Sequence, residues 1–149
     1  MDTERIRMEL LDVLQEHMKK ALPVPEGVRI NFAFRILEGF PTVDGICDTA
    51  GVSQETVESV LSKYVHYGVA QIHERSESIT YEYLGLSDDI KKFWRGNPVR
   101  VESLDHALKA GEDYLQTLES SLDEEGAKEV TLWRSAFEKM REEFLGEEP

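Results

Sequence analysis

The chain has 149 residues, of which 40% are hydrophobic and 32% charged, and its formal net charge is −13. This length predicts one domain with room for a buried core, and the apolar fraction argues against disorder. No apolar run reaches the roughly 18 residues that a membrane span needs, and no signal peptide opens the chain. The single cysteine, Cys47, excludes an internal disulfide. We therefore expect a cytoplasmic protein without a membrane partner.

The negative charge is concentrated towards the C-terminus. Residues 97–149 carry six basic and fourteen acidic side chains, whereas residues 27–96 carry seven basic and ten acidic ones. Affinity for DNA is dominated by neutralisation of phosphates, so a DNA-binding surface is expected to be basic. This chain can offer such a surface only locally.

Two helices are predicted before residue 40. Residues 1–22 place apolar side chains, including Leu10 and Leu14, on one stripe, and Pro23 and Pro25 end that helix. Residues 26–39 form the next candidate, with Phe32 among its apolar side chains. We expect this second helix to support the two that follow.

The stretch from residue 42 to residue 72 predicts two helices joined by a tight turn. Gly51 can end the first helix in a left-handed conformation, and Ser53 can cap the second. Thr42 can cap the first helix in the same way. Apolar side chains recur at spacings of three and four on both sides of the turn: Val43, Ile46, Cys47 and Ala50 before it, and Val57, Val60, Leu61, Tyr64 and Val65 after it.

This pattern resembles the winged helix-turn-helix of MarR/ArsR-type transcriptional regulators, over roughly residues 28–86. The residues that carry the resemblance are Thr42, Val43, Ile46, Gly51, Val52, Ser53, Thr56, Val57, Leu61 and the Gly68-Val69 pair. The resemblance implies a mainly α fold with a small β-hairpin wing, in which the second helix enters the major groove of DNA. It also implies a dimeric repressor or activator.

The helix at residues 54–67 would then carry the contacts to DNA. The side chains that the resemblance directs towards the groove are Ser53, Gln54, Glu55, Thr56, Ser59 and Lys63. Hydroxyl and amide groups can bond base edges or phosphates, and a lysine can meet a phosphate. The carboxylates at residues 55 and 58 oppose this reading, and the helix has no arginine, the commonest reader of guanine.

Residues 69–84 predict two short strands around a polar turn, which would form the wing. Arg75 is the wing residue expected to reach a phosphate or the minor groove. A solvated hairpin tip is the alternative for the same residue. Beyond the wing, Ser87 is expected to cap a short helix that ends near Trp94.

A basic cluster lies between residues 91 and 100 and consists of Lys91, Lys92, Arg95 and Arg100. It could contact DNA phosphates beside the wing. It could equally pair with the acidic C-terminal helices, where carboxylates are abundant.

Two helices are predicted to follow a break at residues 96–98, at about residues 103–122 and 124–145. Their apolar seams suggest helix-helix packing, with Gly111 interrupting the first. One reading is packing onto the N-terminal helix within the chain. The other is a homodimer interface, as in regulators of GbsR-type layout, and its expected residues are Leu10, Leu14, Leu115, Trp133, Phe137, Met140 and Phe144. The sequence thus divides into a helix at residues 1–24, a winged helix at residues 26–96 and a helical hairpin at residues 99–149.

No catalytic motif is present: there is no nucleophile elbow, no HExxH and no glycine-rich phosphate loop. The four histidines show no zinc spacing, and a cofactor, a metal or an enzymatic activity is not expected. Two functions remain open. One is a dimeric regulator that binds double-stranded DNA. The other is an acidic winged-helix module that binds another protein in a chromosome or transcription assembly.

Overall fold

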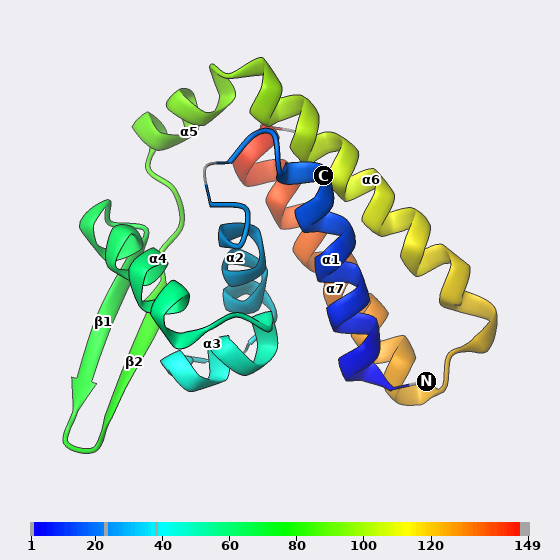
Figure 1. Cartoon of the computed structure of the whole chain (residues 1–149), viewed down its shortest axis with the longest axis horizontal. Coiled ribbons are helices and arrows are strands. Elements are labelled where there is room, and N and C mark those ends of the chain that lie inside the picture. The colour runs from blue at the N-terminus through cyan, green and yellow to red at the C-terminus, as the bar shows by residue number, and fades with distance from the viewer. Residues whose placement is uncertain (1, 23, 38, 147–149) are drawn as a thin grey trace.

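In the computed structural model, which describes residues 2–22, 24–37 and 39–146, the chain is mostly helical with one two-stranded antiparallel hairpin (Figure 1). This confirms the expected mainly α fold with a small hairpin. The elements are α1 (Thr3–Met18), α2 (Gly27–Ile36), α3 (Val43–Ala50), α4 (Gln54–His66), β1 (Ala70–Arg75), β2 (Ser78–Tyr83), α5 (Asp88–Arg95), α6 (Pro98–Leu118), a 3₁₀ turn (Glu119–Ser121), α7 (Glu124–Met140) and a π-helical turn (Arg141–Leu145). Met1 and Pro23, part of the predicted first helix and its stop, lie outside the described residues.

The terminal helices α1, α6 and α7 pack against one another and form a bundle (Figure 1). Their apolar stripes share one core with one side of α2. Phe32 of α2 lies 5.4 Å from the ring of Trp133 and 5.8 Å from that of Phe137, measured between ring centroids. The described parts of the ranges 1–24 and 99–149, predicted as separate segments, therefore share a single core. None of the described helices is long and apolar enough to cross a membrane.

Gly111 does not interrupt α6. It is buried where Phe137 of α7 crosses the helix, and a Cβ at this position would lie 2.8 Å from the phenyl Cζ and 3.3 Å from a methyl of Leu14. Because Gly111 has no side chain, the ring of Phe137 can pack directly against the α6 backbone. A glycine costs helix stability by itself, and here the close packing offsets that cost.

The structure places the seven predicted interface side chains inside one chain. Leu10, Leu14, Leu115, Trp133, Phe137, Met140 and Phe144 are all buried in the bundle core. The reason is that α1 packs against both C-terminal helices and covers their seams within the chain. The structure therefore shows these seams packed within the chain, and their use as an interface between two copies stays a prediction.

The second core lies under α3, α4 and the hairpin, and α2 separates it from the bundle core. Val28, Phe32 and Ile36 of α2 face the bundle, whereas Ile30 and Ala33 face this second core. The α2 helix is therefore buried on both sides. We call the unit formed by α2, α3, α4 and the hairpin the head.

The turn between α3 and α4 has the predicted chemistry. Thr42 accepts a hydrogen bond from the Gly45 N–H and caps α3. Gly51 follows α3 at φ +68°, in the left-handed region that favours glycine. Ser53 accepts from the Thr56 N–H and caps α4, as predicted.

The hairpin pairs Ala70 with Tyr83 and Arg75 with Ser78, in antiparallel register. The Tyr81 N–H donates to the Pro41 carbonyl oxygen at 2.9 Å, so the loop before α3 extends the pairing on the outer side of β2. Tyr81 and Tyr83 pack on the second core, and the far end of the hairpin projects beyond it (Figure 1).

The C-terminal helices differ from the prediction at their ends. The α6 helix begins at Pro98 instead of near residue 103, because the Asn97 side chain caps it and proline suits the first helical turn. Regular α-helix in α7 ends at Met140, and the π-helical turn carries the chain to Leu145. Ser87 caps α5 as predicted.

Candidate nucleic-acid interface

The exposed face of α4 is the surface that the sequence assigns to DNA. Glu55, Ser59 and Lys63 are exposed there and make no side-chain hydrogen bond or ion pair among the described residues. The opposite face of the helix supplies Val57 and Leu61 to the core of the head. The α4 helix is thus held by its apolar side, and its polar side is left for a partner.

Three other predicted contact residues already have partners at the start of α4. The Ser53 and Thr56 hydroxyls lie 2.9 Å apart, and the former also holds the helix cap. The Gln54 amide donates to a carboxylate oxygen of Glu58 at 3.0 Å. To read a base edge, these groups would have to exchange a local hydrogen bond for one to DNA.

Arg75 is exposed at the last position of β1, next to the hairpin turn. It pairs in register with Ser78 and makes no side-chain hydrogen bond or ion pair within residues 2–22, 24–37 and 39–146. A cation in this position can reach a phosphate beside the groove that α4 would occupy. The structure therefore leaves Arg75 available for the predicted role.

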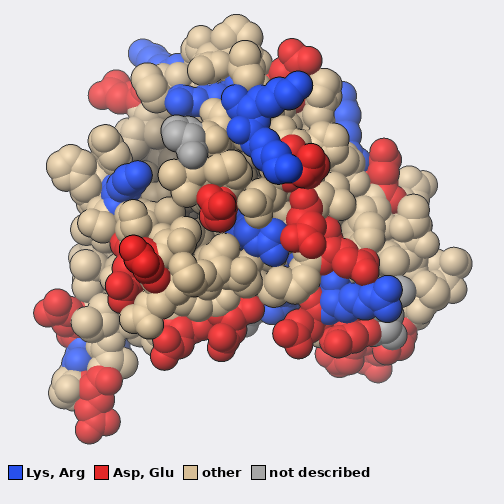
Figure 2. All heavy atoms as spheres, viewed as in Figure 1, with Lys and Arg blue, Asp and Glu red and all other residues tan. Residues whose placement is uncertain are grey.

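The charge around these residues is mostly negative. Exposed carboxylates on α3, α4 and the hairpin outnumber the two exposed cations of the site, and they are Asp44, Asp48, Glu55, Glu58, Glu74 and Glu77. In Figure 2, acidic side chains follow the lower edge of the molecule below α3 and the hairpin end, and basic ones gather at the upper edge. No continuous basic strip joins Lys63 to Arg75 among the described residues.

Cys47 lies on α3, half-buried against the head core. Burial, followed by the nearby carboxylates of Asp44 and Asp48, raises the pKa of its thiol. The thiol therefore stays protonated at neutral pH, as expected for a small packing residue.

The four residues of the basic cluster, on α5 and in the first turn of α6, make different contacts. The Arg95 guanidinium donates to the carbonyl oxygens of residues 142, 143 and 144, at 3.4, 2.9 and 3.2 Å. The Arg100 guanidinium lies 5.1 Å from the centroid of the exposed Phe93 ring. Lys91 and Lys92 make no ion pair in the described part of the chain. Half of the cluster thus serves the structure, and Arg95 meets the C-terminal segment through carbonyl groups instead of carboxylates.

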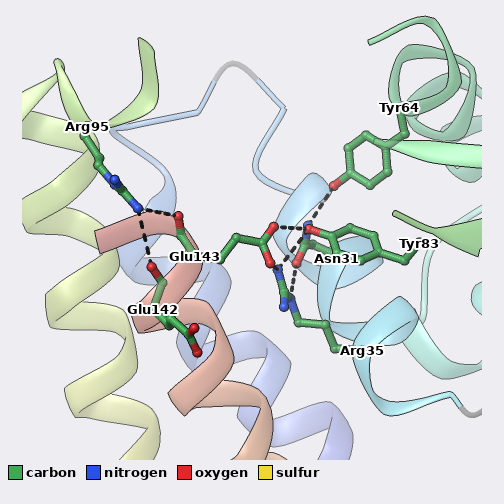
Figure 3. Close-up of polar contacts among 7 residues, drawn as sticks. All are labelled: Asn31, Arg35, Tyr64, Tyr83, Arg95, Glu142 and Glu143. Carbon is green, nitrogen blue, oxygen red and sulfur yellow. Dashed lines mark hydrogen bonds and ion pairs between the residues drawn. The ribbon is translucent and has the colours of Figure 1, made fainter. Parts of the chain in front are cut away.

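A polar network that the sequence reasoning missed joins the head to the bundle (Figure 3). Arg35 of α2 donates to a Glu143 carboxylate oxygen at 3.0 Å and to the Tyr83 hydroxyl at 2.9 Å. The same hydroxyl donates to the other Glu143 oxygen at 2.6 Å. Asn31 accepts from Arg35 and donates to the hydroxyl of Tyr64. We call Arg35, Tyr83 and Glu143 the latch.

The side chains of the latch are largely buried. The Arg35 side chain is 5% exposed and that of Glu143 17%. Burial raises the pKa of the Tyr83 hydroxyl, so that it remains a neutral donor. The sequence signal was the presence of polar side chains, Arg29, Asn31 and Arg35, in a largely apolar helix, but nothing in the sequence indicated the partner of Arg35 108 residues away.

A second arginine of α2 ties the head to α1. Arg29 donates through Nε to the Ala50 carbonyl oxygen at the end of α3 and through Nη1 to Asp12 and Gln15 of α1. Its partners thus come from two elements outside α2. Together with the latch it fixes the head on the bundle at two separate places.

Two clefts lie between head and bundle. One, of about 410 Å³, is lined by Arg7, Met8 and Asp48 among others, and the other, of about 420 Å³, opens beside the latch. Within the described residues no three His, Cys, Asp or Glu side chains come together to hold a metal ion. Comparison with protein-family models, curated proteins and solved structures gives no match.

Proposed function

We propose that the head is a winged helix that binds double-stranded DNA, and that the chain acts as a cytoplasmic transcriptional regulator. The observation that carries the proposal is the exposed polar face of α4, whose side-chain hydrogen bonds join only Ser53 to Thr56 and Gln54 to Glu58 within the described residues. The cap at Ser53, the left-handed Gly51 and the hairpin beside α4 support the same assignment.

In this proposal α4 lies in a major groove and the hairpin lies along the adjacent backbone. Ser59 and Gln54 face base edges, and Lys63 and Arg75 each meet a phosphate. Glu55 can accept a hydrogen bond from the amino group of cytosine, which is the one base contact that favours a carboxylate. Two phosphate contacts imply weak binding with a small salt dependence, so sequence preference has to come from the base contacts.

Binding as a homodimer to a palindromic site is part of the proposal, since paired half-sites multiply the affinity of a weakly binding head. The seven core residues are buried within the chain, so we place that dimer on other residues. The outer faces of α6 and α7 are polar, and large exposed apolar side chains near the bundle are limited, within the described residues, to Val24, Phe93 and Val99. Pairing on DNA is therefore more compatible with the surface than a permanent apolar interface.

The test is fluorescence anisotropy with a pool of random duplexes, followed by selection of a preferred site and titration at several salt concentrations. We expect Lys63→Ala and Arg75→Ala each to weaken binding and to reduce the salt slope by about one unit. Lys128→Ala is the matched control, because that exposed lysine lies at the start of α7, away from the head. Equal slopes for the wild type and both head variants would reject the proposal.

The second candidate is a winged helix that binds a protein. The excess of carboxylates over cations around α4 favours it, because such a surface repels phosphate and attracts a basic partner. In this case duplex DNA causes no salt-sensitive change in anisotropy. A Glu55→Lys, Glu58→Lys double variant separates the two candidates. If the head binds DNA, the variant should bind DNA more strongly. If the head binds a protein, the variant should capture a basic partner more weakly.

A further inference from the structure

We infer that Glu143 is a positioning residue, which acts through Arg35 and Tyr83 to fix the hairpin on the head. The inference rests on the proposed function only for its effect on DNA. The claim about the hairpin itself is independent of what the head binds.

The geometry of the latch joins three elements at one carboxylate. Glu143 belongs to the π-helical turn, Arg35 to α2 and Tyr83 to the last position of β2. Each pair of these residues is hydrogen-bonded, at 2.6 to 3.0 Å. Figure 3 shows the carboxylate reaching from the C-terminal turn to the other two side chains. The base of the hairpin is therefore attached to the π-helical turn that follows α7.

Removal of Glu143 would leave a buried cation without its counterion. A buried guanidinium that loses its carboxylate has to move towards water or find a new acceptor. Arg35 also lies over the ring of Tyr83, 4.9 Å from its centroid, so its displacement removes a contact on the same strand. The hairpin gives Arg35 both a hydrogen bond and a ring contact, whereas the bundle core gives it the ring of Phe144, at 5.8 Å from the guanidinium, so we expect the hairpin to respond more than the bundle core.

The position of Glu143 is itself held from the other side. Arg95 of α5 donates to the carbonyl oxygens of the π-helical turn, and these are among the carbonyls left without helical partners at the end of a helix. The cleft of about 420 Å³, lined in part by Lys91 and Lys139, gives solvent access to the latch. A change at the C-terminal turn would therefore reach the hairpin through Tyr83, and it would also reach Tyr64 of α4 by way of Arg35 and Asn31.

The experiment is hydrogen exchange of the full chain, resolved by peptide, for Glu143→Ala, Glu142→Ala and Tyr83→Phe. Glu142 is the matched control, since it loses the same charge one residue away and its side chain has no hydrogen bond or ion pair among the described residues. We expect Glu143→Ala to increase exchange in residues 70–83 by roughly tenfold, with little change in α6. Tyr83→Phe should increase it by a smaller factor, because the Arg35 ion pair remains.

Equal hairpin protection in Glu143→Ala and Glu142→Ala would overturn the inference. If the Glu143→Ala variant shows faster hydrogen exchange throughout the chain, the Tyr83→Phe variant becomes the deciding one. Unchanged exchange of the hairpin in Tyr83→Phe would then overturn the inference. Duplex affinity should fall by roughly two- to thirtyfold in Glu143→Ala and stay constant in Glu142→Ala. Faster hairpin exchange in a protein that binds no duplex would reject the proposed function and leave the latch supported.

Discussion

The bundle and the head use their apolar side chains differently. In the described parts of α1, α6 and α7, every large apolar side chain is buried or half-buried except Val99 in the first turn of α6. The head leaves five such side chains exposed, which are Phe40, Tyr67, Ile72, Ile79 and Leu84. The bundle therefore has a complete core and a polar exterior, and the head has a surface that its own core does not cover.

This difference indicates that the bundle and the head have different roles. The large core of the bundle is expected to contribute most of the stability, whereas the small core of the head, beside an exposed hairpin, is expected to contribute less. The head is attached to the bundle through α2, the Arg29 contacts and the latch. We therefore expect core substitutions in the bundle to act on stability and substitutions on the head to act on binding.

The largest effect is expected for Phe137→Ala, which leaves a void against Gly111. The cost in free energy of unfolding should be about 3–5 kcal/mol, because a fully buried ring is removed from a packed site. Urea unfolding at two protein concentrations measures it. The midpoint should not depend on concentration, and a midpoint that rises with concentration would indicate that this seam is an interface between copies.

Next in size is Gly51→Ala, which forces a side chain into the left-handed region at the turn of the head. We expect a loss of about 1–2 kcal/mol in the free energy of unfolding. Gly68→Ala is the control, since it has a similar φ of +75° and no atom within 4 Å of the added Cβ. The Gly51 variant should be the more destabilised, because its Cβ would lie 2.9 Å from the sulfur of Met8. The reverse order would contradict the contact between head and α1.

Ser53→Ala removes the cap of α4 and should cost about 1 kcal/mol by thermal unfolding. Ser135→Ala, at an exposed position of α7, should change stability by less than about 0.5 kcal/mol. If the two variants were equally stable, the cap would not hold α4 in solution.

The smallest effect concerns Asp105 of α6, whose pKa lies below its ordinary value because of the hydrogen bond from Arg141 and the ion pair with Lys109. A lowered folded-state pKa stabilises the fold above the unfolded pKa of about 3.9, and this stability is lost as the pH falls through the folded value. Asp105→Asn should therefore lower the free energy of unfolding at pH 7 by less than about 1 kcal/mol. A difference from the wild type that persisted unchanged at pH 2 would contradict this sign.

Much of the head could be predicted from local chemistry. The caps at Thr42, Ser53 and Ser87 and the left-handed Gly51 depend on neighbouring residues only, and all four appear in the structure. Which helix packs on an apolar stripe depends instead on segments that are distant in the sequence. For this reason the sequence predicts the aromatic seam around Trp133 as a dimer interface, whereas the structure packs it within the chain.

The candidate site shows the same limit. The sequence identified Lys63 and Arg75 as exposed cations, and the structure leaves both available. It did not identify the latch, because a salt bridge between Arg35 and Glu143 has no signature in either segment. It also gave no indication that Gly111 makes room for a ring from another helix.

The most direct test of the central claim, that α4 and the hairpin are the functional surface and the bundle is its support, is a ¹⁵N–¹H titration of the full chain with its selected duplex. The account predicts that the largest shift changes fall in residues 53–66 and 70–83, with the outer faces of α6 and α7 unaffected. Largest changes in α5 or in the bundle, with residues 53–66 unperturbed, would contradict it.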